Sequence, residues 1–224
     1  MSYLPCVETI TREPINAAVI WLHGLGADGN DFAGIVPHLA QPEGVNIRYV
    51  FPHAPRLAVT INGGMQMPAW YDILEMSLDR KVDTDQLRAS ADAVIALIER
   101  EIERGISPER IVLAGFSQGG AVAYEAALSY QKRLAGVMCL STYLATRETI
   151  RLSAEQKPTP FLIHHGSADP VVPVQLGEQA RDWLTQRDYA VEYKAYPMQH
   201  QVCPQQIADI RDWLTSVLPP ITQS

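Results

Sequence analysis

Residues 110–130 read RIVLAGFSQGGAVAYEAALSY, and this stretch decides the fold. It opens with an apolar run, 110–114, that is typical of a buried strand, and it closes with a helical pattern over 118–130. A G-x-S-x-G motif at 115–119 lies between them. Because the two glycines carry no Cβ atoms that would collide with neighbouring backbone, the motif predicts a tight strand-to-helix turn that exposes the hydroxyl of Ser117.

Short apolar runs and helical patterns alternate along the rest of the chain. The clearest helical pattern covers 84–104, between Asp83, which can accept hydrogen bonds from the first backbone N–H groups, and Gly105, which can end a helix in a left-handed conformation. Such alternation predicts an α/β fold, a mostly parallel central sheet with helices on both faces. The predicted strands are 17–22, 46–51, 110–114, 134–140, 160–164 and 191–195, and the other predicted helices are 118–130, 174–187 and 205–218.

The chain shows no sign of division into parts. Its 224 residues contain no Gly/Ser/Pro-rich linker and no repeat of fixed period, which predicts a single domain over 1–224 without a separate cap domain. The segment 56–80 has neither a strand nor a helix period and is too long for an ordinary connection. We expect it to form a lid-like insertion that walls a pocket.

Composition and charge exclude several classes of protein. With 47% hydrophobic residues the chain can bury a substantial core, and a formal charge of −7 with scattered basic residues argues against a nucleic-acid partner. No apolar run reaches the roughly 18 residues of a membrane span, and no export signal precedes Ile20, so we expect a cytoplasmic protein. The three cysteines are widely spaced and predict reduced thiols, with no disulfide framework and no metal site.

A serine hydroxyl is a poor nucleophile near neutral pH, so it needs a general base, and the base needs an anion that fixes its tautomer. When this turn occurs in α/β enzymes, the partners follow in the order Ser, Asp or Glu, His. Three histidines follow Ser117, namely His164, His165 and His200. His164 and His165 precede the best-placed acid, Asp169, so they do not fit the order in which the histidine follows the acid. His200 is therefore the predicted base.

Position along the predicted strands supports the same choice. Asp169 comes just after the strand at 160–164, and His200 follows the strand at 191–195, whereas Asp182 and Asp188 fall in or near a helical pattern. Carboxyl ends of parallel strands meet at one edge of a sheet, which is the edge where open α/β sheets bind ligands. The sequence therefore predicts a catalytic triad of Ser117, Asp169 and His200.

A glycine-rich loop, H-G-L-G at 23–26, follows the first predicted strand. Its glycines allow close approach of the backbone to a substrate, so the N–H groups of Leu25 and Gln118 are the predicted oxyanion donors. The glycines at 24, 26 and 29 also match G-x-G-x-x-G, a dinucleotide-binding pattern. That alternative needs an acidic residue about 20 residues further on, where the second strand instead ends V-F-P-H at 50–53.

Together these motifs resemble the small carboxylesterase and acyl-protein thioesterase family of α/β-hydrolases, with bacterial carboxylesterases as the nearest kin. The resemblance covers nearly the whole chain and rests on H-G-L-G at 23–26, W-Y-D at 70–72, G-F-S-Q-G-G at 115–120, D-P-V-V-P at 169–173 and the histidine at 200. It implies a serine hydrolase that cleaves carboxylic esters or thioesters of acyl chains through an acyl-enzyme, without a cofactor. Ser117 would be the nucleophile, His200 the base and Asp169 its orienting acid.

The resemblance also implies that the insertion at 56–80 walls an apolar groove for the acyl chain. The candidates for this groove are Trp70, Leu74, Tyr143 and Val171. Relatives often carry glycine before the histidine, where this chain has Gln199, which puts the conformation of that loop in question. A lysophospholipase, a protein deacylase and a non-catalytic binding protein of hydrolase fold are the alternatives. An apolar lid could contact substrate, a membrane surface or a second subunit, so a homodimer stays open as well.

Overall fold

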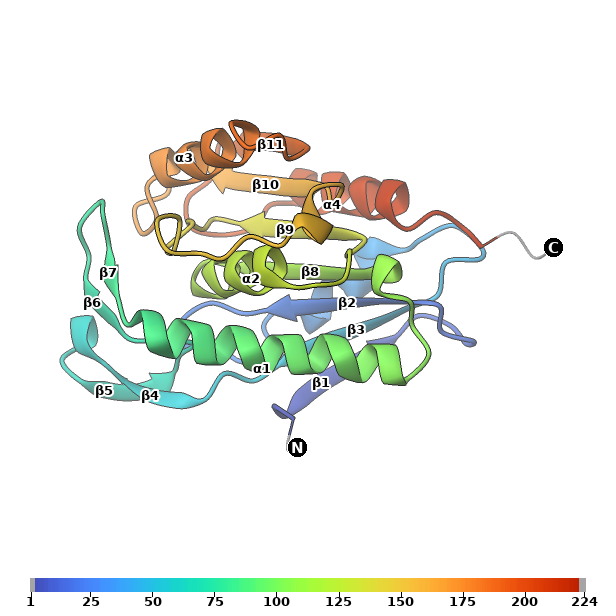
Figure 1. The fold of residues 1–224 in the computed structure, drawn as a ribbon, viewed down its shortest axis with the longest axis horizontal. Helices are drawn as coiled ribbons and strands as arrows, with labels where there is room; N and C mark the ends of the chain where they lie inside the picture. The colour runs from blue at the N-terminus through green and yellow to red at the C-terminus, as the bar shows by residue number, and fades with distance from the viewer. Residues whose placement is uncertain (1–2, 222–224) are drawn as a thin grey trace.

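The computed structural model describes residues 3–221, and its centre is a seven-stranded sheet in the order β1-β3-β2-β8-β9-β10-β11 (Figure 1). Neighbouring strands run parallel except β1, which pairs antiparallel with β3. The predicted mostly parallel sheet is therefore confirmed. Its strands are β1 (Cys6–Ile10), β2 (Ala17–Leu22), β3 (Ile47–Pro52), β8 (Ile111–Phe116), β9 (Gly136–Leu140), β10 (Phe161–Gly166) and β11 (Val191–Tyr196).

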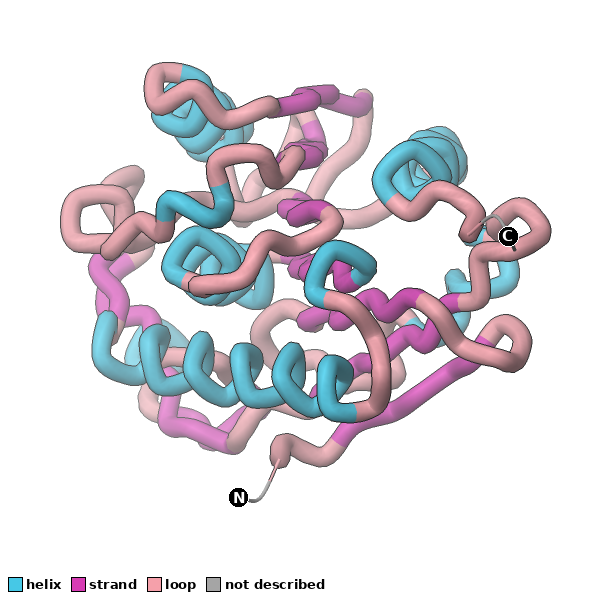
Figure 2. The backbone as a smooth tube through the Cα atoms, turned by 45° about the vertical axis from the view of Figure 1, so that its right-hand side comes forward, coloured by secondary structure: helices cyan, strands magenta, loops and turns pink. Residues whose placement is uncertain are grey.

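Helices cover both faces of the sheet (Figure 2). Buried side chains of α1, α2 and α3 form one apolar cluster with the sheet, and those of α4 and the short 3-10 helix η1 form a second cluster on the other face. The bounds are α1 (Thr84–Glu103), α2 (Gln118–Ser129), α3 (Val174–Thr185), α4 (Pro204–Val217) and η1 (Ala33–Leu39). In residues 3–221, no helix combines the length and apolar character that crossing a membrane requires.

The ends of α1 follow from single residues. The Asp83 carboxylate accepts a hydrogen bond from the N–H of Gln86, and Gly105 has a φ of 93°, beyond the reach of most L side chains. Strand β1 was missed because it is a half-exposed edge strand with no continuous apolar run, whereas every residue of β2 is buried.

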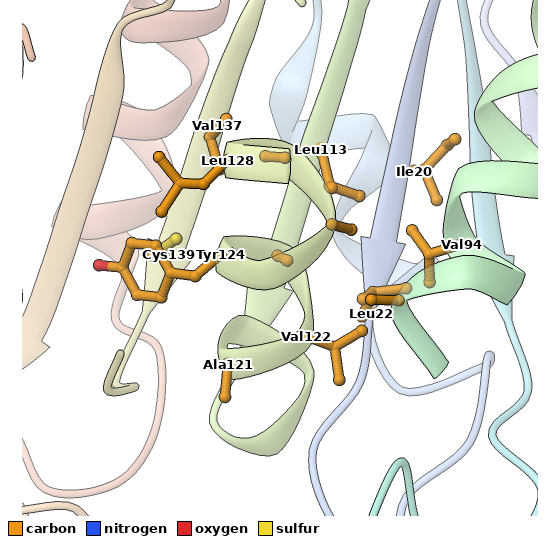
Figure 3. Packing of buried hydrophobic residues seen from close by; sticks show 14 of the residues in the cluster. Ile20, Leu22, Val94, Leu113, Ala121, Val122, Tyr124, Leu128, Val137 and Cys139 are labelled. Atoms are coloured by element: carbon orange, nitrogen blue, oxygen red, sulfur yellow. The ribbon is translucent and has the colours of Figure 1, made fainter. Parts of the chain in front are cut away.

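Helix α2 packs unusually close to the sheet, and this fixes the position of its N-terminus. All residues from Gln118 to Leu128 are buried. A Cβ atom at Gly119 would lie 2.5 Å from the carbonyl oxygen of His23, and one at Gly120 would overlap the Thr142 side chain. Further along α2, Tyr124 and Leu128 lie against β9 (Figure 3). Small residues at its start and larger ones further on therefore hold the helix rigidly against the sheet.

The insertion at 56–80 lies beyond the carboxyl ends of the parallel strands, at the left of Figure 1. Its strands form two small antiparallel sheets, one of β4 (Arg56–Val59) with β5 (Met65–Pro68), the other of β6 (Ile73–Glu75) with β7 (Lys81–Val82), which directly follows the insertion. The 3-10 helix η2 (Thr60–Asn62) follows β4. These short elements place the insertion over the edge of the sheet where the predicted site residues lie.

Candidate active site

Ser117 occupies the turn between β8 and α2 in a backbone conformation that L residues rarely adopt, with φ 54° and ψ −122°. The glycines on either side permit this turn, since a Cβ atom at Gly115 would overlap the backbone of Gly119. The neighbouring strand β9 adds support, because the Ser117 N–H donates to the Leu140 carbonyl at 2.9 Å. Backbone strain is thus concentrated at the residue whose hydroxyl the turn exposes.

Replacing Ser117 by glycine is expected to abolish activity and yet give a protein more stable than the Ser117→Ala variant. Glycine adopts this conformation without the strain of about 1–3 kcal/mol, and its larger entropy loss on folding offsets part of that gain. We expect the thermal midpoint of Ser117→Gly to exceed that of Ser117→Ala by a few degrees, on the order of 2–4 °C. Equal midpoints in calorimetry would show that the turn is not strained.

The structure brings the three predicted triad residues together. His200 Nε2 lies 3.0 Å from Ser117 Oγ, and His200 Nδ1 lies 2.6 Å from Asp169 Oδ2. Because the Asp169 carboxylate can only accept, Nδ1 carries the imidazole proton and leaves Nε2 free to accept from the serine hydroxyl. The chain Asp169–His200–Ser117 is thus arranged to withdraw a proton from the serine.

The loop before His200 accommodates Gln199 at the position where relatives often carry glycine. The Gln199 side chain is exposed, and its φ is not positive, so the backbone there needs no glycine. The backbone that needs glycine here is that of Gly166, which packs against the loop, because a Cβ atom at Gly166 would overlap the Gln199 carbonyl. The glycine on which this loop depends is therefore Gly166, at the end of β10.

Asp169 is held as an anion by its own loop. Its Oδ1 accepts hydrogen bonds of 2.8 Å from the N–H groups of Val171 and Val172. Burial alone would raise the pKa of this carboxyl, but the hydrogen bonds from His200 and the two N–H groups outweigh burial and lower it. Asp169 therefore stays charged at neutral pH and can stabilise an imidazolium at His200.

The two histidines rejected by chain order are buried in β10. His165 Nε2 donates to the Val172 carbonyl at 2.8 Å, and His164 lies against Tyr196, with neither ring hydrogen-bonded to Ser117. Burial lowers the pKa of both imidazoles, that of His164 to about 4. Both are neutral at pH 7 and help to hold the strand and the acid loop in place.

His164 should make the protein sensitive to mild acid. The unfolded chain takes up a proton at His164 near pH 6.5 and the folded chain only near pH 4, so stability is full above pH 6.5 and falls as the pH drops between these values. Between pH 7 and pH 5 this group should account for a loss of about 2 kcal/mol. Urea denaturation of His164→Gln should show a correspondingly smaller loss, and an equal loss in both proteins would contradict this assignment.

The predicted oxyanion donors belong to residues that border the same pocket as Ser117. In the described chain, 3–221, the backbone N–H groups of Leu25 and Gln118 have no hydrogen-bond acceptor, so both are free to donate to a substrate. Gly24 packs against the serine, since a Cβ atom placed there would lie 3.4 Å from Ser117 Cβ. Gln118 is also the first residue of α2, where the helix dipole favours negative charge.

A pocket of about 400 Å³ opens onto Ser117 and His200. The insertion at 56–80 contributes much of its wall, and the remaining apolar surface comes from residues such as Leu25 and Phe116. One cationic and one acidic side chain, Arg80 and Asp31, also border it. The wall residues from the insertion are Ile61, Asn62, Ile73, Met76 and Arg80.

Of the four predicted acyl-groove residues, the structure places Tyr143 and Val171 on the pocket wall. The prediction differs from the structure at Leu74 and Trp70. Leu74 is 48% exposed on β6, where alternate side chains point to opposite sides, so its neighbour Ile73 faces the pocket instead. Trp70 is fully buried and does not line this pocket. Sequence reasoning missed Ile73, because the three residues of β6 are too few to show an alternating pattern.

A serine on a strained strand-to-helix turn, with histidine and aspartate beside it at the carboxyl edge of a mostly parallel sheet, defines a serine hydrolase of the α/β-hydrolase class. The chain belongs to the phospholipase/carboxylesterase family, whose pattern matches residues 6–218. It is 36% identical to acyl-protein thioesterase 1 of Gibberella zeae over 215 residues, which cover 91% of this chain and 92% of that protein.

Two further relatives agree with this assignment. Acyl-protein thioesterase 1 of Neurospora crassa is 38% identical over 216 residues, with 92% of this chain and 88% of that protein covered. The crystal structure of SOBER1 from Arabidopsis thaliana matches with a TM-score of 0.84 at 30% identity, covering 91% of this chain and 99% of that one. The similarity thus extends over sequence and fold together.

Proposed function

We propose that this protein hydrolyses carboxylic esters and thioesters of acyl chains through an acyl-enzyme formed on Ser117. The observation that carries the proposal is the continuous hydrogen-bonded chain from Ser117 Oγ through the His200 imidazole to the Asp169 carboxylate. Membership of the phospholipase/carboxylesterase family supports the ester, and the names of the two fungal relatives support the thioester.

Each half of the reaction uses the same groups. Ser117 Oγ attacks the acyl carbonyl carbon while His200 Nε2 takes the hydroxyl proton, and the N–H groups of Leu25 and Gln118 stabilise the oxyanion. His200 then donates that proton to the departing alkoxide or thiolate, which leaves as an alcohol or thiol. Water attacks the acyl-enzyme, gives its proton to His200, and the proton returns to Ser117 Oγ as the acid departs.

The pocket limits the class of acyl group. Apolar side chains from the insertion and from Tyr143 and Val171 surround the reactive serine, which suits a hydrocarbon chain. No cofactor enters this scheme, because every proton transfer is assigned to a residue of the chain.

We also include a cytoplasmic location in the proposal, supported by three cysteines that form no disulfide in residues 3–221.

The test is an acyl-chain profile measured on the purified protein. Rates on p-nitrophenyl esters and on matched S-acyl thioesters, with chains from two to sixteen carbons, would define the substrate class. Stoichiometric labelling by a fluorophosphonate would show an activated serine, which a non-catalytic binding protein lacks. Failure to hydrolyse any of these substrates together with failure to label would overturn the proposal, while lysophospholipids and S-acylated peptides separate the lysophospholipase and deacylase alternatives.

A further inference from the structure

Trp70 contacts both segments that carry the proposed oxyanion donors, the glycine-rich loop at 23–26 and the N-terminus of α2. Its indole Nε1–H donates to the carbonyl oxygen of His23 at 2.8 Å, in the loop that contains Leu25. Its backbone N–H donates to the side-chain Oε1 of Gln118, also at 2.8 Å. One residue of the insertion is therefore hydrogen-bonded to both segments.

The contacts around Trp70 leave it little freedom. The Gln118 side chain also donates from Nε2 to the Tyr71 carbonyl at 2.6 Å, so this one amide binds two successive residues of the insertion. The Ser90 hydroxyl of α1 donates to the Trp70 carbonyl at 2.5 Å. The indole also packs on the His23 ring, with centroids 5.1 Å apart, and Trp70 is fully buried. A buried set of hydrogen bonds that is satisfied in this way is rigid.

The His23 ring, on which the Trp70 indole packs, is itself held by two hydrogen bonds. His23 Nδ1 donates to the Gly24 carbonyl at 2.7 Å, and His23 Nε2 accepts from the N–H of Ala54 at 3.1 Å. Burial lowers the pKa of this imidazole, which keeps it neutral and able to accept. The glycine-rich loop is thus held in place by Trp70 on one side and by Ala54, just after β3, on the other. The free N–H of Leu25 lies only two residues after His23 in this loop.

We propose that Trp70 is a positioning residue that sets the separation and direction of the Leu25 and Gln118 N–H groups. The inference rests on the proposed function, because it concerns the stabilisation of an oxyanion at Ser117. Such donors act only when they lie within about 2.7–3.1 Å of the developing charge, and a displacement of about 1 Å can cost on the order of 100-fold in rate.

The test compares Trp70→Phe with Trp21→Phe. Both substitutions remove the same atoms from a buried tryptophan, but Trp21 Nε1 has no hydrogen-bond partner in the described chain. We expect Trp70→Phe to lower kcat about 10-fold to 100-fold with KM within about twofold, and to weaken binding of an acyl trifluoromethyl ketone by a similar factor. Trp21→Phe should leave kcat and the affinity for the ketone within about twofold.

A second variant protects the test against a failure of folding. Gln118→Met removes the amide that binds Trp70 and Tyr71 but keeps the backbone N–H of residue 118. Its kcat should fall in the same way. The double variant should lose less than the product of the single effects, because both substitutions act by loosening the same residue, at position 70.

The outcomes separate the inference from the proposed function. An inactive wild-type protein would overturn the proposed function. An active wild type in which Trp70→Phe behaves like Trp21→Phe, or changes only KM or the thermal midpoint, would overturn the role of Trp70 alone.

Discussion

Replacing Ser117 by alanine is expected to lower kcat for acyl-ester hydrolysis on the order of 10⁶-fold, the largest effect that a single substitution in this chain should produce. The variant keeps the pocket, the two free N–H groups and the His200–Asp169 pair, but no hydroxyl remains 3.0 Å from His200 Nε2. Only the slow attack of water on a bound ester is left. KM should change little, because the alanine removes a reacting group and leaves the pocket wall intact.

The matched control for this substitution is Ser129→Ala on the same helix. Ser129 lies at the other end of α2, where its hydroxyl donates to the Glu125 carbonyl at 2.7 Å. Removal of that hydroxyl should leave kcat within about twofold, since it touches no reacting atom. If Ser117→Ala retained more than a few per cent of wild-type kcat, Ser117 would not be the nucleophile. Fluorophosphonate labelling should vanish in Ser117→Ala and persist in Ser129→Ala.

Chain order and strand ends were enough to predict which three side chains meet. The sequence places Ser117, Asp169 and His200 directly after predicted strands, and parallel strands bring their carboxyl ends to one edge whatever the connections between them. The structure then places these residues after β8, β10 and β11. This part of the site follows from topology, which short-range patterns reveal well.

The wall of the pocket was harder to predict because the insertion has no long period. Which side of β6 faces the pocket depends on pairing with the two residues of β7, a contact that local sequence does not signal. Trp70 shows a second limit. The family resemblance suggested Trp70 for the acyl groove. In the structure its indole N–H donates to His23, 47 residues away, and its backbone N–H donates to Gln118, 48 residues away. Hydrogen bonds between distant segments leave no periodic trace in the sequence.

Replacing Asp169 by asparagine is expected to lower kcat about 10⁴-fold while the protein stays folded. The amide oxygen can still accept from the N–H groups of Val171 and Val172, so the loop should keep its shape. The amide NH₂, however, then faces His200 Nδ1, which must become an acceptor. His200 Nε2 would carry the proton instead and could not take another from Ser117, so the substitution leaves the base in the wrong tautomer.

Asp182→Asn provides the control for this substitution, because Asp182 lies on α3, is largely exposed and, among residues 3–221, forms an ion pair with Arg181 alone. Its removal should leave kcat unchanged within about twofold and cost little stability, as exposed ion pairs contribute little. Thermal unfolding at pH 7 should show that Asp169→Asn is folded. A loss in kcat of less than about 10-fold for Asp169→Asn would mean that the carboxylate is not needed to orient His200. A loss of activity in Asp182→Asn as well would point to a general effect of removing acidic charge, because that residue has no contact with the histidine.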